Sequence, residues 1–219
     1  MIEAKGHKPT KPKLLIDGHR QASQTVVLAH GAGAGMESEF MQAMADGLAC
    51  HGLRVIRFEF PYMIRRREAQ TRRPPDRESV LRDAWLEVIE SLEVDRLIVG
   101  GKSMGGRIAS LIADEAEVAG LVCLGYPFHP PGKPDKLRTE HLKTIRTPTL
   151  IVQGERDALG NKQDVAGYNL SNNVQFHWLP DGDHSFKPRK RSGRSQDDNW
   201  NDALRITAKF AQLHSKSRD

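Results

Sequence analysis

The chain alternates short apolar runs with longer segments whose apolar residues recur at helical spacing. The short runs are rich in β-branched residues and end at glycine or proline, as buried strands do; they cover 25–30, 53–60, 95–101, 120–127, 147–154 and 174–180. Segments with the helical period fall between or after them, at 38–52, 78–93, 106–116 and 199–216. Strands alternating with helices predict an α/β protein, a three-layer α/β/α sandwich around a mostly parallel sheet.

The length of the chain favours one domain. A chain of 219 residues is long enough for one sizeable core, so residues 1–219 are expected to fold as a single unit. Residues 1–20 are a short extension with a first strand, for which KLLID is the only candidate before residue 25. Residues 187–198 are expected to form a basic, mobile loop.

Charge is spread unevenly along the chain. The net charge is +5, yet RRREAQTRRPPDR (65–77) carries six arginines against two acids, and KPRKRSGR (187–194) carries five basic residues and no acid. Both runs follow predicted strands and are expected at the same edge of the sheet. A single charge run is usually a solvated surface, but two on one rim favour an anionic substrate. Because no aromatic residues are interleaved with them, nucleic acid is an unlikely partner.

The remaining composition bears on the cellular compartment. Cys50 and Cys123 have no close partner in the pattern, which predicts free buried thiols in a reducing compartment. The first twenty residues are polar and basic without an apolar stretch, and no apolar run approaches the length of a membrane span. The protein is therefore expected to be soluble and cytoplasmic, with no membrane partner; nothing in the sequence predicts its oligomeric state.

The strongest chemical signal is GGKSMGG (100–106), directly behind a predicted strand and ahead of a predicted helix. Residues 101–105 fit G-x-S-x-G, in which a tight strand-to-helix turn exposes the serine hydroxyl at the edge of the sheet. Ser103 is the candidate nucleophile. A flexible Gly/Ser turn is the alternative, and only partner residues can decide between them.

A serine hydroxyl needs a base to take its proton and an acid to orient that base. The expected order is Ser, Asp or Glu, then His, each after a later strand. Asp157 follows the strand at 147–154, and His184 follows the strand at 174–180. Alone, Asp157 fits a turn or helix cap and His184 fits a solvated loop; together with Ser103 they favour a catalytic triad.

A tetrahedral intermediate also needs donors for its oxyanion. One expected donor is the backbone N–H of Met104, which follows the nucleophile. The other is expected in the GAGAG loop (31–35), from Ala32 or Gly33, between which the sequence does not choose. His30 is expected to brace this loop rather than to react.

Other chemistries fit poorly. GAGAGM is not G-x-G-x-x-G, and a phosphate-binding loop ending at GGKS would need glycine where Arg96 stands. DGDH (181–184) has no second ligand cluster, so neither a metal nor a cofactor is predicted.

These motifs together resemble the α/β-hydrolase superfamily over nearly the whole chain. LAHGAGAGM, GGKSMGGR, GYPFHPPGKP, LIVQGERDALG and DGDHSFKPRK are similar to one branch of small hydrolases of unassigned activity. That branch also includes the hydrolase-like region of a chromatin acetyltransferase-complex subunit. The resemblance implies a compact α/β-hydrolase fold with reduced N-terminal strands, and Ser103, Asp157 and His184 as the triad. It implies no substrate.

About twenty residues (128–147) separate two of the strands, so no large lid domain is expected and FHPPGK is the expected cover. His129 either contacts substrate or caps the proline turn; Arg65, Arg66 and Lys187 are further substrate-contact candidates. The sequence thus favours a serine hydrolase acting on a small carboxylic ester or thioester, with an anionic substrate possible. The alternatives are a binding module that kept the fold without turnover and a triad used for perhydrolysis or lyase chemistry.

Overall fold

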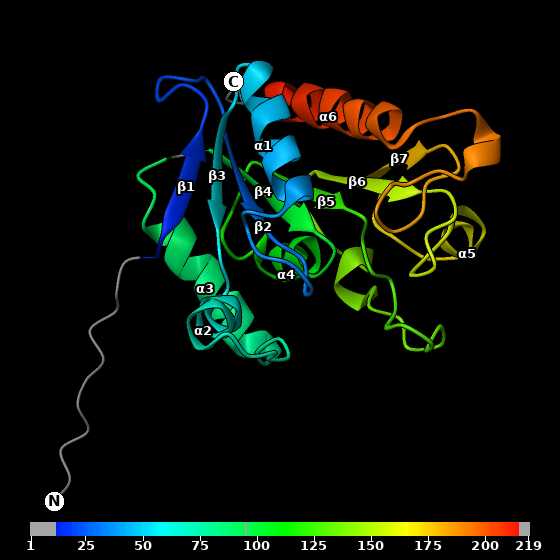
Figure 1. Ribbon diagram of the computed structural model, residues 1–219, viewed down its shortest axis with the longest axis horizontal. Coiled ribbons are helices and arrows are strands. Elements are labelled where there is room, and N and C mark those ends of the chain that lie inside the picture. The colour runs from blue at the N-terminus through cyan, green and yellow to red at the C-terminus, as the bar shows by residue number, and fades with distance from the viewer. Residues whose placement is uncertain (1–11, 95, 215–219) are drawn as a thin grey trace, which may run out of the picture.

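The fold is built around one twisted sheet (Figure 1). The computed structural model describes residues 12–94 and 96–214, which contain seven strands in the spatial order β1-β3-β2-β4-β5-β6-β7. Strand β1 pairs antiparallel with β3, and the other pairings are parallel. The strands are β1 Leu14–Asp17, β2 Thr25–Ala29, β3 Arg54–Phe58, β4 Leu97–Lys102, β5 Gly120–Leu124, β6 Thr149–Gly154 and β7 Val174–Leu179.

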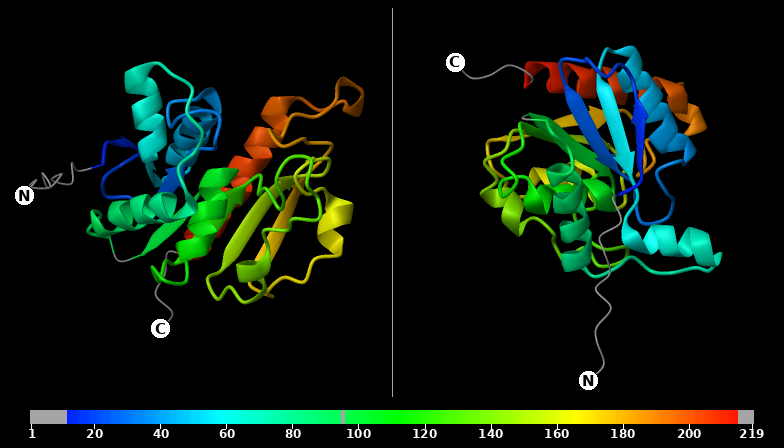
Figure 2. Two further views of the ribbon diagram at one scale, coloured as in Figure 1. Left: turned by 90° about the horizontal axis from the view of Figure 1, so that it is seen from below. Right: turned by 90° about the vertical axis from the view of Figure 1, so that its left-hand side faces the viewer.

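Helices cover both faces of this sheet, as Figure 2 shows. Helices α1 (Glu39–Cys50) and α6 (Gln196–Leu213) pack together on one face, and α3 (Glu78–Glu90) and α4 (Met104–Ile112) on the other. Shorter elements follow β3, β5, β6 and β7; they are α2 Pro61–Ala69, the 3-10 turn η1 Glu140–Lys143, α5 Lys162–Ala166 and the 3-10 turn η2 Lys190–Ser192. The predicted α/β sandwich is confirmed.

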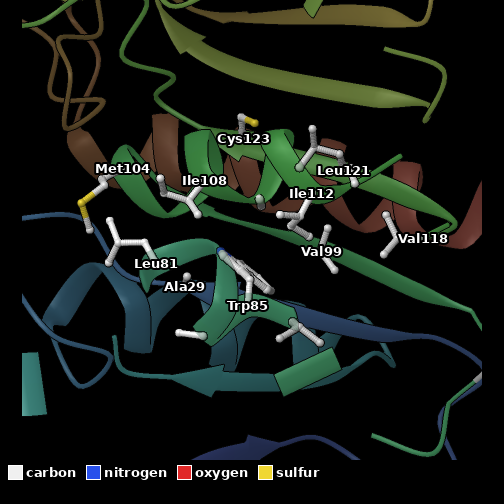
Figure 3. Packing of buried hydrophobic residues seen from close by; sticks show 14 of the residues in the cluster. Ala29, Leu81, Trp85, Val99, Met104, Ile108, Ile112, Val118, Leu121 and Cys123 are labelled. Carbon is white, nitrogen blue, oxygen red and sulfur yellow. The ribbon is translucent and has the colours of Figure 1, made fainter. Parts of the chain in front are cut away.

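The two helical layers enclose separate apolar cores. Strand residues are buried on both faces because a parallel sheet has helices on both sides, and all five residues of β2 are buried. On the α3/α4 side, Trp85 lies fully buried against Phe58, with ring centroids 4.7 Å apart. Figure 3 shows how the side chains of α3 and α4 meet over the strands on this side.

The parallel strands bring distant loops to one edge of the sheet. Strands β2, β4, β6 and β7 all run the same way, so the loops that follow them share the carboxyl edge. In open α/β sheets this edge is where ligands bind. The GAGAG loop, the turn at Ser103 and the segments holding Asp157 and His184 follow these four strands.

Some local expectations were wrong. Five of the thirteen residues of the basic run 65–77 are helical, because α2 extends from Pro61 to Ala69. Cys50 is exposed at the end of α1, whereas Cys123 is buried in β5 as expected. The segment 187–198, expected as a loop, contains η2 and the first turn of α6, which Ser195 caps by accepting from the N–H of Asp198. The extension 1–20 contains β1, while residues 1–11 lie outside the described part.

None of the described helices is long and apolar enough to cross a membrane.

Candidate active site

Ser103 occupies the sharp turn between β4 and α4. Its φ and ψ angles are 51° and −114°, a conformation that L-residues rarely adopt. Such strained backbone costs on the order of 1–3 kcal/mol and persists only where the surroundings enforce it. Here the N–H of Ser103 donates to Leu124 O at 3.0 Å, and its carbonyl accepts from the N–H of Arg107 in α4. The turn directs the serine side chain beyond the end of the strand.

The glycines around Ser103 allow β4 and α4 to approach β2. A Cβ atom on Gly101 would lie 2.1 Å from the carbonyl oxygen of Ala29, and one on Gly105 would lie 2.3 Å from the same atom. Both distances are too short for any side chain. The glycine-rich sequence is therefore required by close packing of backbone against backbone, and a flexible turn does not explain it.

Ser103, His184 and Asp157 form a continuous hydrogen-bonded chain. His184 Nε2 lies 2.8 Å from Ser103 Oγ, and His184 Nδ1 lies 2.7 Å from Asp157 Oδ2. The Asp157 side chain is fully buried, whereas that of His184 is 28 % exposed. The structure thus brings together the three side chains that the sequence placed in separate loops. The carboxylate sits at the buried end of the chain and the hydroxyl at the accessible end.

Asp157 is fixed by further donors. The N–H of Leu159 donates to Asp157 Oδ1 at 2.8 Å, and Gln153 Nε2 donates to Asp157 Oδ2 at 2.8 Å. Gln153 also accepts from the N–H of Tyr126 at 2.7 Å, so its amide ties β6 to the end of β5. Sequence reasoning missed Gln153. The available signal was a glutamine within the otherwise apolar strand TLIVQG.

Lys102, the residue before Ser103, contacts the backbone of the histidine. Its Nζ donates to the carbonyl oxygen of His184 at 2.5 Å. The ammonium also lies over the rings of Phe40 and Phe186, at 5.6 and 5.4 Å from their centroids. Burial lowers the pKa of Lys102 to about 8, although Asp157 and Asp183 act in the opposite direction. This role was also missed; a lysine ending an apolar strand was the only signal.

Two cavities meet at Ser103. One has a volume of about 440 Å³ and is lined by the 31–34 loop, the start of α1, Lys102, Ser103 and His184. The other, of about 320 Å³, is lined among others by Ala32, Ser103, Met104, Pro127 and Pro131. Ala32 and Ser103 line both cavities. Pro131 of the FHPPGK segment therefore lines the site, while the role of this segment as a cover stays a prediction.

His30 contacts the GAGAG loop through Gly31. Its Nδ1 lies 2.7 Å from Gly31 O, and its Nε2 accepts from the N–H of Phe60 at 3.1 Å. These contacts define a neutral ring with the proton on Nδ1. Burial lowers the pKa of His30 to about 4, against a smaller opposite effect of the Gly31 carbonyl. The ring connects the loop after β2 to the start of α2.

Two side chains of helix α2 also contact this loop. The Tyr62 hydroxyl lies 3.1 Å from Ala32 O and 3.3 Å from Gly31 O, and Arg66 Nη1 donates to Gly33 O at 3.3 Å. Three successive carbonyl groups of the loop are thus directed toward α2. In the described part of the chain, no group accepts from the N–H of Ala32, Gly33 or Met104.

The other substrate-contact candidates lie in different surroundings. Arg65 pairs with Asp76 at 2.5 Å. His129 is only 5 % exposed, and its Nδ1 lies 3.0 Å from Pro130 O, within the proline turn. Lys187 is exposed and lines neither cavity at Ser103. Of these candidates, only Arg66 contacts the loop beside Ser103. Within residues 12–94 and 96–214, no three His, Cys, Asp or Glu side chains are grouped to hold a metal ion.

Comparisons with known proteins agree with this architecture. A family model described as an alpha/beta hydrolase domain matches residues 22–212. The rat protein ABHD14B, whose name gives it as a candidate protein-lysine deacylase, is 29 % identical over 147 residues, which cover 66 % of this chain and 67 % of that protein.

Solved structures match over nearly the full length. An α/β serine hydrolase without a lid from Xanthomonas campestris, XC6422, matches with a TM-score of 0.67 and 20 % identity, covering 90 % of this chain and 88 % of that one. Est1E from Butyrivibrio proteoclasticus matches with a TM-score of 0.69 and 14 % identity, covering 92 % and 93 %. At such identities the likeness establishes a common fold.

Proposed function

Because the chain belongs to the alpha/beta hydrolase domain family, we propose that it is a serine hydrolase that cleaves a carboxylic ester or thioester by acyl transfer. The observation that carries the proposal is the hydrogen-bonded chain from Ser103 Oγ through His184 to the buried Asp157 carboxylate. A serine in a strained turn, next to a histidine that can take its proton, is the arrangement that nucleophilic catalysis needs.

In the first step His184 Nε2 takes the proton of Ser103 while Oγ attacks the carbonyl carbon of the substrate. The imidazolium that forms keeps its Nδ1 proton in the 2.7 Å contact with Asp157. The carboxylate stabilises this positive charge without taking the proton. Gln153 and Leu159 keep the carboxylate oriented toward the ring, because each donates to one of its oxygens.

The oxyanion of the tetrahedral intermediate is assigned to the N–H groups of Met104, Ala32 and Gly33. In a trans peptide, the carbonyl of one residue and the N–H of the next point in opposite directions. The carbonyls of Gly31 and Ala32 face Tyr62 on α2, so the N–H groups of Ala32 and Gly33 face away from that helix. Met104 adds an N–H at the first position of α4, where the helix dipole favours negative charge.

The intermediate then collapses to an acyl-enzyme. His184 gives its Nε2 proton to the leaving oxygen or sulfur as the bond to the carbonyl carbon breaks. Water enters, His184 takes one of its protons, and the hydroxide attacks the acyl carbon. Collapse of the second intermediate returns the proton to Ser103 Oγ and releases a carboxylic acid. The two cavities at Ser103 offer separate places for the acyl and leaving groups.

A fluorophosphonate probe tests this proposal. We expect a single labelled residue, Ser103, located by peptide mass, and no labelling of Ser103→Ala or His184→Ala. Hydrolysis of p-nitrophenyl acetate by Ser103→Ala should fall at least about a thousandfold. Ser110→Ala is the matched control, because Ser110 Oγ also lies 2.8 Å from a histidine nitrogen, that of His141, but is buried in α4.

Two results would contradict the proposal. Folded wild-type protein that stays unlabelled and does not hydrolyse the ester would favour the alternative of a non-catalytic binding module. Turnover that yields a peracid or an elimination product instead of a carboxylic acid would assign the triad to another reaction.

A further inference from the structure

The three arginines of α2 differ in their partners. Arg65 pairs with Asp76, and Arg67 Nη2 lies 3.1 Å from Glu59 Oε2. Arg66, between them, is half-buried and pairs with no carboxylate in the part of the chain that the structure describes. Its Nη1 donates a hydrogen bond to Gly33 O at 3.3 Å. One edge of the guanidinium, with Nε and Nη2, has no partner among these residues.

Arg66 lines a third cavity, of about 560 Å³, between α2 and the loop at 33–38, which we call the α2 cavity. The α2 cavity shares Gly33, Ala34 and Ser38 with the larger of the two cavities at Ser103. The two cavities are therefore adjacent. Gly33, which accepts the hydrogen bond from Arg66, lines both the cavity at Ser103 and the cavity at Arg66.

The charges lining the α2 cavity leave one positive charge unmatched. Arg66, Arg67 and Arg72 line it, against Glu37 and Glu59. Arg67 and Glu59 already compensate each other. A ligand group with a single negative charge would balance the lining, whereas a doubly charged phosphate would reverse its sign. The free edge of a guanidinium also matches the two oxygens of a carboxylate.

We propose that the substrate carries a carboxylate at the end remote from the scissile carbonyl, and that Arg66 binds it in the α2 cavity. The proposal rests on the proposed function, because it identifies the substrate class of the same site. The hydrolase would then prefer monoesters of dicarboxylic acids, whose acyl chain ends in a free carboxylate, over neutral esters of the same length. Arg65, tied to Asp76, and Lys187, outside the cavity, have no such role.

The preference is measured with matched ester pairs. p-Nitrophenyl monoesters of succinate, glutarate and adipate are compared with p-nitrophenyl butyrate, valerate and hexanoate by the ratio of their kcat/KM values. We expect the anionic ester to be preferred for at least one chain length, and Arg66→Gln to lower that ratio about tenfold or more. Lys187→Gln removes the same charge from the rim and should leave the ratio within about twofold.

The ratio of the two kcat/KM values distinguishes two roles for Arg66, binding of the substrate carboxylate and support of the loop at Gly33. If Arg66 only holds Gly33, Arg66→Gln slows both esters of a pair equally and the ratio stays constant, which would overturn the proposal. A wild-type enzyme that favours the neutral ester at every chain length would overturn it as well.

A binding measurement tests the carboxylate site independently of whether the protein is a hydrolase. In the folded wild-type protein labelled with ¹⁵N, monomethyl glutarate should shift the Arg66 Nε–H signal saturably, with the signal assigned by its loss in Arg66→Gln. This holds even if Ser103 proves unreactive. No shift at tens of millimolar ligand, or stronger binding of inorganic phosphate than of monomethyl glutarate, would reject the carboxylate site.

Discussion

At the scale of single residues, the position of His184 is set by a few side-chain contacts. His184 follows the edge strand β7, and its position depends on contacts that its own loop does not supply. Asp157 orients the ring, while Lys102 holds the backbone carbonyl and is itself placed by Phe40 and Phe186. Lys102 is adjacent to Ser103 in the chain, so one strand end fixes both the nucleophile and the loop that carries its base.

Removal of the Lys102 ammonium should therefore impair the reaction more than the binding of substrate. For Lys102→Met we expect kcat for p-nitrophenyl acetate to fall about tenfold or more with little change in KM, because small displacements of a catalytic group are costly. Since the pKa of Lys102 is lowered to about 8, the wild-type rate should decline as the pH rises through this value, and the decline should be absent from the variant.

The exposed Lys209 on α6 provides the control. Lys209→Met should retain the wild-type kcat and pH profile. Unchanged kcat in Lys102→Met would show that His184 holds its position without the ammonium.

At the scale of elements, the site depends on how closely α4 and α2 approach the end of β2. Helix α4 begins with two glycines after Met104, and α2 contributes Tyr62 and Arg66 to the loop after β2. The sequence pattern indicated α4 but not α2. Pro61 was interpreted as the end of a strand, although proline is also favoured at the first position of a helix. The three arginines and few apolar residues that follow gave no clear helical stripe.

Gly105→Ala tests the approach of α4 to β2. Alanine normally stabilises a helix relative to glycine by about 1 kcal/mol, but here its Cβ would lie 2.3 Å from Ala29 O and 2.7 Å from His30 O. Since both are backbone atoms in a packed core, we expect the free energy of unfolding in urea to fall by roughly 2 kcal/mol or more.

Gly167→Ala is the matched control at the end of α5. Gly167 has a negative φ of −92°, and a Cβ atom there would lie at an ordinary van der Waals distance of 3.6 Å from Asp164 O. We expect its free energy of unfolding to stay within about 0.5 kcal/mol of the wild-type value. Equal effects of the two substitutions would show that α4 can move away from β2 at little cost.

For the whole molecule, buried histidines make stability depend on pH. Burial lowers the pKa of His30 from 6.5 to about 4, and lowers that of His141, in the 3-10 turn η1, to about 4 with help from Arg107. Between about pH 6.5 and pH 4 the unfolded chain binds more protons than the folded protein. The free energy of unfolding therefore falls as the pH falls through this window.

For His30 alone the loss should reach roughly 2 kcal/mol at about pH 5. Urea unfolding at about pH 7.5 and pH 5 measures it, and His30→Gln should show a smaller difference between the two pH values because glutamine does not titrate. An unchanged difference in His30→Gln would assign the acid sensitivity to other groups.

Other whole-molecule properties stay predictions. They are a single domain over 1–219, a cytoplasmic location, the narrower branch shared with a chromatin-complex subunit, and the improbability of nucleic acid as a partner.

The sequence by itself predicted the strands and the four longer helices along the chain, and it placed Ser103, Asp157 and His184 in loops that follow three of the strands. These follow from local signals: apolar period, turn residues and the loop that each side chain occupies after its strand. Only the tertiary structure decided that Lys102, Gln153 and Tyr62 support the site, and that Arg66 differs from Arg65 and Arg67 in having no carboxylate partner among the described residues. Their roles depend on contacts between residues distant in the chain, such as Lys102 with His184 and Arg66 with Gly33, and no local pattern encodes which distant groups will meet.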